Sequence, residues 1–125
     1  MADVPSNVHP AAMKFLGKEM YVCVTRPVRS PEIDKRLGEH LAHMIELEKK
    51  GTLFGAGPLY SAGSATPEAG MFVIRARSFE EAEAIVREEP LHRAGLRQYT
   101  LQKWRLNEGS YTVTVNYSDK SVQIA

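Results

Sequence analysis

The chain has 125 residues, of which 43% are hydrophobic and 25% charged, and its formal net charge is +1. These values are typical of one globular domain with its own core, and the near-neutral charge gives no indication of a nucleic-acid or membrane partner. Because no apolar run approaches the roughly 20 residues that span a bilayer, and the start lacks a signal-peptide pattern, we expect a cytoplasmic protein.

Residues 1–17 mix prolines with polar residues and are interpreted as an N-terminal arm, in which Ala11 to Gly17 forms a helical turn or two. Lys18 to Arg26 alternates polar and apolar residues and predicts a first strand. The single cysteine, Cys23, lies inside this strand, and burial as a small apolar residue is favoured over a reactive thiol. No residue spacing typical of a zinc or haem site occurs, so we expect neither a metal nor a cofactor.

A helix is predicted from Pro31 to Lys50. Ser30 is placed to cap its start, and Gly51 suits the left-handed conformation that ends a helix. A titratable ring, His40, lies inside the apolar stripe of this helix, and that is the most function-like feature of the chain. The alternative is a histidine at the edge of the core, bonded to a backbone carbonyl. The residues of the stripe recur at helical spacing: Ile33, Leu37, Met44 and Leu47.

The next segment, Thr52 to Leu59, is predicted as a strand in which Gly55 and Gly57 favour a bulge or a close approach of the backbone. A backbone that binds an oxyanion is the weaker alternative for these glycines. The small-residue loop from Ser61 to Gly70 is interpreted as a linker, with a lid over a site as the alternative. Met71 to Ala76 then forms a further strand.

A second helix begins after Ser78, which caps it together with Glu81, three residues later. It ends at Glu89, because the residue before a proline avoids the helical conformation. Leu91 to Gly95 is interpreted as a connector, and Leu96 to Arg105 as the fourth strand.

The resulting order, strand-helix-strand-strand-helix-strand, predicts an α+β domain of the ferredoxin-like type over residues 18–105. Both helices would cover one sheet face, so a second copy is expected to cover the other, giving a dimeric α+β barrel. We expect a homodimer or a higher homo-oligomer. Residues 106–125 are expected to form a β extension: Tyr111 to Tyr117 as a strand, with Val122 to Ile124 pairing back on it.

The chain resembles the YCII-related (YciI-like) family of the dimeric α+β barrel superfamily from about Met20 to Trp104. The order and spacing of several short motifs carry the resemblance: His40-Leu41, Lys50-Gly51-Thr52-Leu53, Ala56-Gly57-Pro58, Gly70, Ser78-Phe79-Glu80-Glu81-Ala82, Glu89-Pro90-Leu91, Ala94-Gly95-Leu96 and Lys103-Trp104. In this family, a histidine on the first helix and the aspartate of an Asp-Pro step are the proposed catalytic pair. His40 matches the histidine, whereas Glu89 replaces the aspartate with a carboxylate one methylene longer.

The resemblance implies an enzyme that acts on a small molecule without a cofactor, a lyase or isomerase with His40 as base and Glu89 as its orienting carboxylate. Dehydrochlorination of a chlorinated hydroxyquinol is one such reaction, and muconolactone isomerases share the fold and a proton-transfer task. Four further residues are candidate substrate-binding groups: Arg26, Gly57, Tyr60 and His92. The alternative function is a homodimer that binds a small ligand or regulates through contacts without catalysis. A cavity beside His40 favours the enzyme, and a filled core there favours the alternative.

Overall fold

The computed structural model describes residues 8–125, so residues 1–7 of the expected N-terminal arm lie outside the described part. The described residues form two compact units. One unit runs from Glu19 to Arg105, and the other combines residues 8–18 with Leu106–Ala125.

The larger unit is built on a four-stranded sheet with the order β2-β3-β1-β4. The strands are β1 (Lys18–Pro27), β2 (Leu53–Leu59), β3 (Ala69–Ile74) and β4 (Arg97–Leu106). β3 pairs antiparallel with both β1 and β2, and Cys23 lies opposite Phe72 in the β1–β3 register. The β2–β3 register shifts between Leu53 and Gly55, as expected for a bulge beside a glycine. This topology confirms the predicted ferredoxin-like α+β class.

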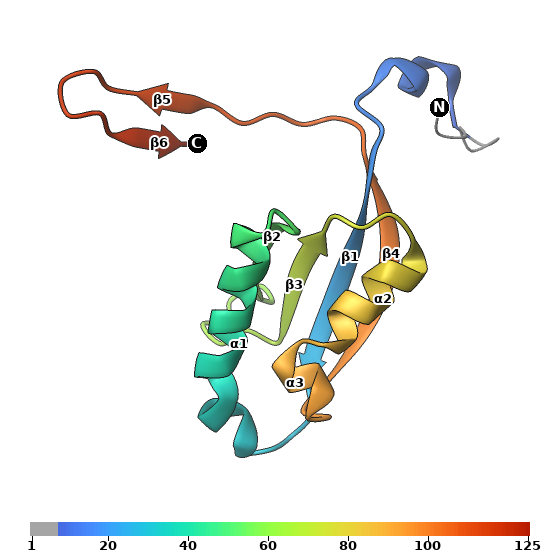
Figure 1. The fold of residues 1–125 in the computed structure, drawn as a ribbon, viewed down its shortest axis with the longest axis vertical. Coiled ribbons are helices and arrows are strands. Elements are labelled where there is room, and N and C mark those ends of the chain that lie inside the picture. The colour runs from blue at the N-terminus through green and yellow to red at the C-terminus, as the bar shows by residue number, and fades with distance from the viewer. Residues whose placement is uncertain (1–7) are drawn as a thin grey trace. The chain divides into compact units, whose positions relative to one another are not determined.

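Three helices lie on one face of this sheet: α1 (Glu32–Lys49), α2 (Phe79–Arg87) and the four-residue α3 (Pro90–Arg93) (Figure 1). Their apolar sides meet alternate residues of β1 and β3, because side chains of a strand point alternately to its two faces. The buried cluster between the layers consists of Tyr21, Cys23, Met44, Leu47, Phe72, Ile74, Ala82 and Val86.

The helix boundaries follow the local capping chemistry. Ser78 caps α2, and its hydroxyl accepts the N–H of Glu81 at 3.1 Å, as predicted. α1 begins one residue later than expected: Pro31 takes the cap position, and the Ser30 hydroxyl accepts the N–H of Glu32 at 3.1 Å. Gly51 follows α1 with φ of 78°, the left-handed value expected of a glycine stop.

The smaller unit contains a short 3₁₀ helix, Pro10–Lys14, and a two-stranded antiparallel sheet of β5 (Val113–Val115) and β6 (Val122–Ile124). The predicted pairing of the C-terminal strands is therefore present, although β5 is shorter than expected. The hairpin exposes apolar residues along both strands and next to them: Tyr111, Val113, Val115, Tyr117, Val122 and Ile124.

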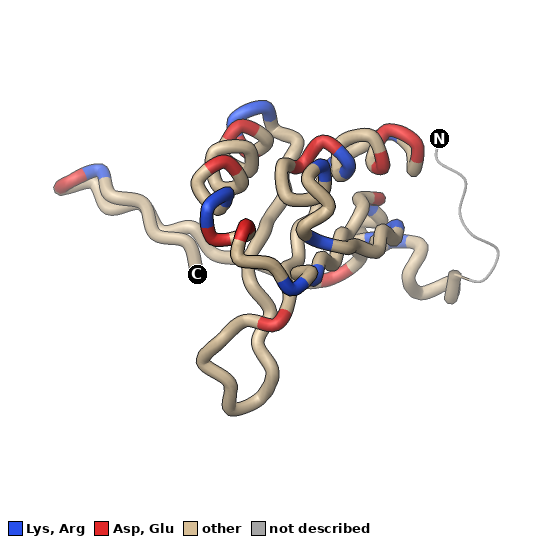
Figure 2. The backbone as a smooth tube through the Cα atoms, turned by 90° about the horizontal axis from the view of Figure 1, so that it is seen from below, with Lys and Arg blue, Asp and Glu red and all other residues tan. Residues whose placement is uncertain are grey.

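Charged positions are mixed rather than separated by sign. Figure 2 shows acidic and basic residues interspersed along the helices, in agreement with the net charge of +1. Among residues 8–125, no helix combines the length and the apolar character that crossing a membrane requires.

Candidate active site

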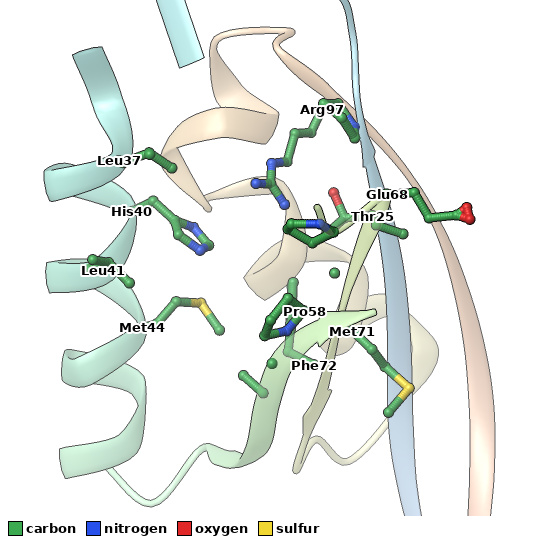
Figure 3. A pocket seen from close by; sticks show the side chains of 16 residues that line it. Thr25, Leu37, His40, Leu41, Met44, Pro58, Glu68, Met71, Phe72 and Arg97 are labelled. Carbon is green, nitrogen blue, oxygen red and sulfur yellow. The ribbon is translucent and has the colours of Figure 1, made fainter. Parts of the chain in front are cut away.

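His40 is brought to the inner side of α1 by helical spacing. It lies one turn before the buried Met44, so both side chains point to the sheet side of the helix. The His40 side chain is 18% exposed, which leaves one edge of the ring open. Figure 3 shows the imidazole pointing from α1 into the space between the helix and the sheet.

The side chain of Glu89, from the segment between α2 and α3, contacts His40 of α1. It is buried, with 1% of its surface exposed, at the junction between α2 and α3. Its Oε1 atom lies 2.6 Å from Nδ1 of His40. Its Oε2 atom accepts the backbone N–H groups of Leu91 at 3.0 Å and His92 at 3.1 Å, so the same carboxylate caps α3.

These contacts determine the charge of Glu89. Burial by itself raises the pKa of a carboxyl group, because it penalises the ionised form. Here the hydrogen bond from His40 and those from the Leu91 and His92 amides outweigh burial, and they hold the pKa of Glu89 below its ordinary value. Glu89 is therefore an anion near neutral pH, and it accepts a hydrogen bond from each of its three partners.

The tautomer of His40 follows from this arrangement. Because an ionised carboxylate only accepts hydrogen bonds, the Nδ1 atom of His40 carries the proton in that contact. In the neutral ring, Nε2 then holds a free lone pair, and the ring points into the open space described above (Figure 3). This is the arrangement of a general base that is oriented by a carboxylate.

A cavity of about 440 Å³ opens beside His40. This volume is in the range of small-molecule sites. Its walls are mostly apolar, and its polar side chains are those of Thr25, His40, Glu68 and Arg97. The apolar residues and glycines that line it come from α1, from β1 to β3 and from the segments beside them: Pro27, Leu37, Leu41, Met44, Ala56, Gly57, Pro58, Pro67, Ala69, Gly70, Met71 and Phe72.

His92 lies behind the cavity and supports its wall. Its Nδ1 atom donates a hydrogen bond to the carbonyl of Val86 at 2.8 Å, so in the neutral ring Nε2 accepts a hydrogen bond from the Thr25 hydroxyl, also at 2.8 Å. Burial lowers the pKa of His92 below its ordinary value, against the opposing effects of Val86 and Glu89. A neutral His92 thus fixes the Thr25 hydroxyl at the cavity wall and leaves its oxygen free to accept a hydrogen bond.

The other predicted site residues separate into two groups. Gly57 lines the cavity, together with its neighbours on β2. Among the residues that the structure describes, the cavity lining does not include Arg26, Tyr60 or His92. Arg26 is exposed, and Tyr60 is 55% exposed just after β2.

Thr25 and Arg97 were missed from the sequence. Thr25 is part of the first strand's alternating pattern and carries no separate signal. Arg97 follows Gly95-Leu96 at the start of a strand, where a basic residue is usually solvated. In the part of the chain described, no group of three or more His, Cys, Asp or Glu side chains is arranged to hold a metal ion.

Comparison with known proteins identifies the family of the chain. The sequence profile of the YCII-related domain matches residues 18–105. A search of curated proteins gave no significant match.

One of the similar solved structures is a named enzyme. The 5-chloro-2-hydroxyhydroquinone dehydrochlorinase TftG from Burkholderia phenoliruptrix AC1100, solved with 2,5-dihydroxybenzoquinone, is 25% identical, with a TM-score of 0.52 over 68% of this chain and 93% of that chain. A dimeric ferredoxin-like protein of unknown function from Thermobifida fusca YX is 14% identical, with a TM-score of 0.42 over 75% of this chain and 96% of that chain. Since the profile covers most of the sequence, the chain belongs to the YCII-related family.

Proposed function

We propose that this chain is a small-molecule lyase or isomerase that uses His40 as a general base and needs no cofactor. One observation carries the proposal: His40 Nδ1 lies 2.6 Å from the buried carboxylate of Glu89 while its ring faces a cavity of about 440 Å³. A carboxylate in this position orients the ring and stabilises the imidazolium formed when Nε2 takes a proton. The open cavity argues against a histidine that only fills the core.

The proposed reaction begins with proton transfer to Nε2 of His40 from a ring hydroxyl, or from a carbon beside a carbonyl. The electron pair of the broken bond moves into the ring. In a dehydrochlorination, His40 first returns this proton to the ring carbon that carries chlorine, which gives a keto form of the ring. Nε2 then takes the proton of a second ring hydroxyl, a C=O bond forms there, and the carbon–chlorine bond breaks as chloride leaves with its electron pair. The imidazolium later releases this proton, so HCl is lost in all. In an isomerisation, the proton returns to another carbon instead. Neither route needs an external oxidant or reductant.

TftG supports a substrate with one ring. That protein is a dehydrochlorinase of a chlorinated hydroxyhydroquinone, and it was solved with a one-ring quinone. The cavity of this chain suits a ligand of this kind, because its volume fits a small molecule and its walls are mostly apolar. An aromatic or quinone-like ring with hydroxyl groups is therefore the proposed substrate class.

The test is chloride release from 5-chloro-2-hydroxyhydroquinone under anaerobic conditions, measured with an ion-selective electrode. We expect His40→Asn to lower the rate by about 10²- to 10⁴-fold, because that is the usual contribution of a general base. His43→Asn is the matched control, since His43 lies on the same helix but outside the cavity lining. A His40→Asn variant as fast as the wild type would reject the base. Tight binding without turnover would favour the ligand-binding alternative.

We also propose that the protein acts as a homodimer through the sheet face away from the helices. Alternation along the strands places Val22, Val24, Phe54, Met71 and Trp104 on this face. Phe54 and Trp104, on the edge strands β2 and β4, are 44% and 37% exposed, and Met71, on the central strand β3, is 40% exposed. Figure 3 shows Met71 pointing away from the cavity. A second copy of the chain would remove this surface from water.

A further inference from the structure

Arg97 is a basic residue in the wall of the cavity, and the proposed function gives it no role. It is the first residue of β4, and its side chain extends from the sheet toward the His40 ring on α1 (Figure 3). Its Nε atom is buried and has no hydrogen-bond partner within residues 8–125. No carboxylate of the described residues forms an ion pair with its guanidinium.

The acidic residue at the cavity does not neutralise Arg97. Glu68 also lines the cavity, but Figure 3 shows its carboxylate pointing away from Arg97 and His40. That carboxylate instead accepts a hydrogen bond from the hydroxyl of Ser61. The positive charge of Arg97 therefore remains uncompensated by the lining residues of the cavity.

An uncompensated arginine in such a place has a physical cost. Its Nε donor is buried without a partner in the described part of the chain, and such a donor loses the hydrogen bond that water would give. The charge also acts on the interior, because Arg97 is among the groups that lower the pKa of the buried His92. A ligand that brings an anionic oxygen to the guanidinium would recover this lost interaction.

The neighbouring strand leaves room for the guanidinium. A Cβ atom added to Gly70 on β3 would lie 3.3 Å from Nη1 of Arg97 and 3.4 Å from Cγ2 of Thr25. The lack of a side chain at Gly70 therefore allows the guanidinium to pass beside β3 toward the cavity. The guanidinium of Arg97 lies against the space that the side chain of an alanine at position 70 would occupy.

From these observations we infer that Arg97 is an anion-binding residue that selects one-ring ligands carrying an anionic oxygen, either a carboxylate or a phenolate or enolate. The ring would lie against the apolar lining, with its anionic oxygen at the Arg97 guanidinium and its opposite edge toward His40. This assignment rests on the proposed function, because it gives the substrate of the His40 site a charge and an orientation.

The test measures binding at equilibrium by titration calorimetry with two pairs of probes. Benzoate is compared with benzamide, and 2,5-dihydroxybenzoquinone at neutral pH with its neutral dimethyl ether. Within a pair the rings are alike, so the difference in affinity reports on the anionic oxygen. We expect the wild type to prefer at least one anion over its neutral partner, and the pair that shows the preference identifies the source of the oxygen.

Arg97→Met should lower the affinity for the preferred anion by roughly 10- to 100-fold, the size of a charge-assisted hydrogen bond, and leave the neutral partner unchanged. Arg97→Lys should keep part of the preference, since it retains the charge but loses the planar fork. Arg77→Met is the matched control, because Arg77 has a side chain that is 93% exposed. Arg26→Met tests the other candidate cation, which lies outside the cavity lining.

The inference is overturned if the wild type binds both members of each pair equally or not at all. It is also overturned if folded Arg97→Met or Arg97→Lys keeps the full preference, or if Arg77→Met or Arg26→Met loses it to the same extent. These binding measurements involve no turnover. Loss of chloride release in His40→Asn, with an unchanged preference in Arg97→Met, would thus uphold the proposed function and reject this inference alone.

Discussion

Nδ1 of His40 and Oε1 of Glu89 lie 2.6 Å apart, although 49 positions separate the two residues in the sequence. One comes from the middle of α1 and the other from the junction of α2 and α3, so only the packing of both helices on one sheet face joins them. Because Oε2 of the same carboxylate caps α3, the pair links the orientation of the His40 ring to the local fold.

The substitution Glu89→Gln removes the negative charge of the side chain and keeps nearly the same size and shape. The Gln oxygen can still cap α3, but its NH₂ group would then face Nδ1 of His40. That contact requires Nδ1 to accept, so the proton moves to Nε2 and the lone pair leaves the cavity. We expect the rate of chloride release to fall by about 10²-fold or more, with a smaller change in KM. Nitrogen NMR of His40 should show the changed tautomer, and an unchanged tautomer with a full rate would contradict the orienting role.

Glu89→Asp restores the aspartate expected from the family resemblance. Aspartate is a good N-cap, so α3 should remain stable. The shorter side chain reaches less far toward His40, and we expect a rate between those of the wild type and Glu89→Gln. Steady-state kinetics with the same substrate measure this order. A rate of Glu89→Asp below that of Glu89→Gln would show that the length of the side chain at position 89 matters more than its negative charge.

Glu89→Ala tests the structural half of the role. It removes the cap of α3 and leaves the amides of Leu91 and His92 without a partner in a buried place. We expect the free energy of unfolding to fall by about 2–4 kcal/mol, from the lost cap and the unpaired amides. Urea denaturation measures the change. Ser78→Ala, which removes the cap of α2, is the comparison and should cost about 1 kcal/mol.

The stability of the fold should depend on pH through His92. Burial lowers the pKa of His92 from its ordinary value of 6.5, so the unfolded chain binds this proton first as the pH falls. The contribution is complete above the unfolded pKa and is lost as the pH drops from about 6.5 toward the lower folded pKa. Urea denaturation across this range should show a falling free energy of unfolding.

His92→Gln should flatten this pH dependence, although it lowers the stability at neutral pH by about 1–2 kcal/mol through weaker contacts to Val86 and Thr25. Glu89 does not interfere in this window. Its pKa is lowered from 4.5, so its contribution is lost only at more acidic pH. A wild type and a variant with parallel pH profiles would contradict the assignment to His92.

Cys23 should be unreactive in the native protein. Burial, with smaller effects of Glu89 and Glu83, raises the pKa of its thiol to about 12, so the reactive thiolate is almost absent at neutral pH. We expect Ellman's reagent to modify Cys23 at the rate of unfolding, and urea to accelerate the reaction. Rapid modification of the native protein would show that β1 opens locally.

The sheet face should determine the oligomeric state. A stable pair normally buries about 1,600 Å² in total, and Trp104→Lys places a charge in the proposed interface. We expect sedimentation to show a wild-type dimer and a monomeric variant at micromolar concentration. Ile45→Lys is the control, because Ile45 is an apolar residue of α1 with 50% exposure, on an element that does not contribute to this face. A monomeric wild type would contradict the proposed interface.

The sequence was a good guide wherever a local rule determines the structure. The capping pair of Ser78 and Glu81, the glycine stop at Gly51 and the alternation of β1 each depend on neighbouring residues alone. The connector predicted from Leu91 to Gly95 instead contains the short helix α3. A proline after a helix predicts a stop, but Pro90 also occupies the first position of the next helix.

The site was harder to predict because its residues meet through tertiary packing. Arg26 was expected to bind substrate from the end of β1, but it directly follows the buried Thr25, and adjacent residues of a strand point to opposite faces. That alternation explains why Thr25 lines the cavity and Arg26 does not. The position of Arg97 depends on the space at Gly70 of another strand, which no local pattern reveals.

The shared carboxylate of Glu89 has a consequence for the sequences that this fold tolerates. In a library selected for folding alone, position 89 would retain residues able to cap α3, while position 40 would accept many side chains beside an open cavity. Selection for turnover would also require a histidine at position 40, and it would still require a residue at position 89 that can cap α3. Comparing the two selections would therefore separate the residue kept for chemistry from the residue that the architecture and the chemistry both require.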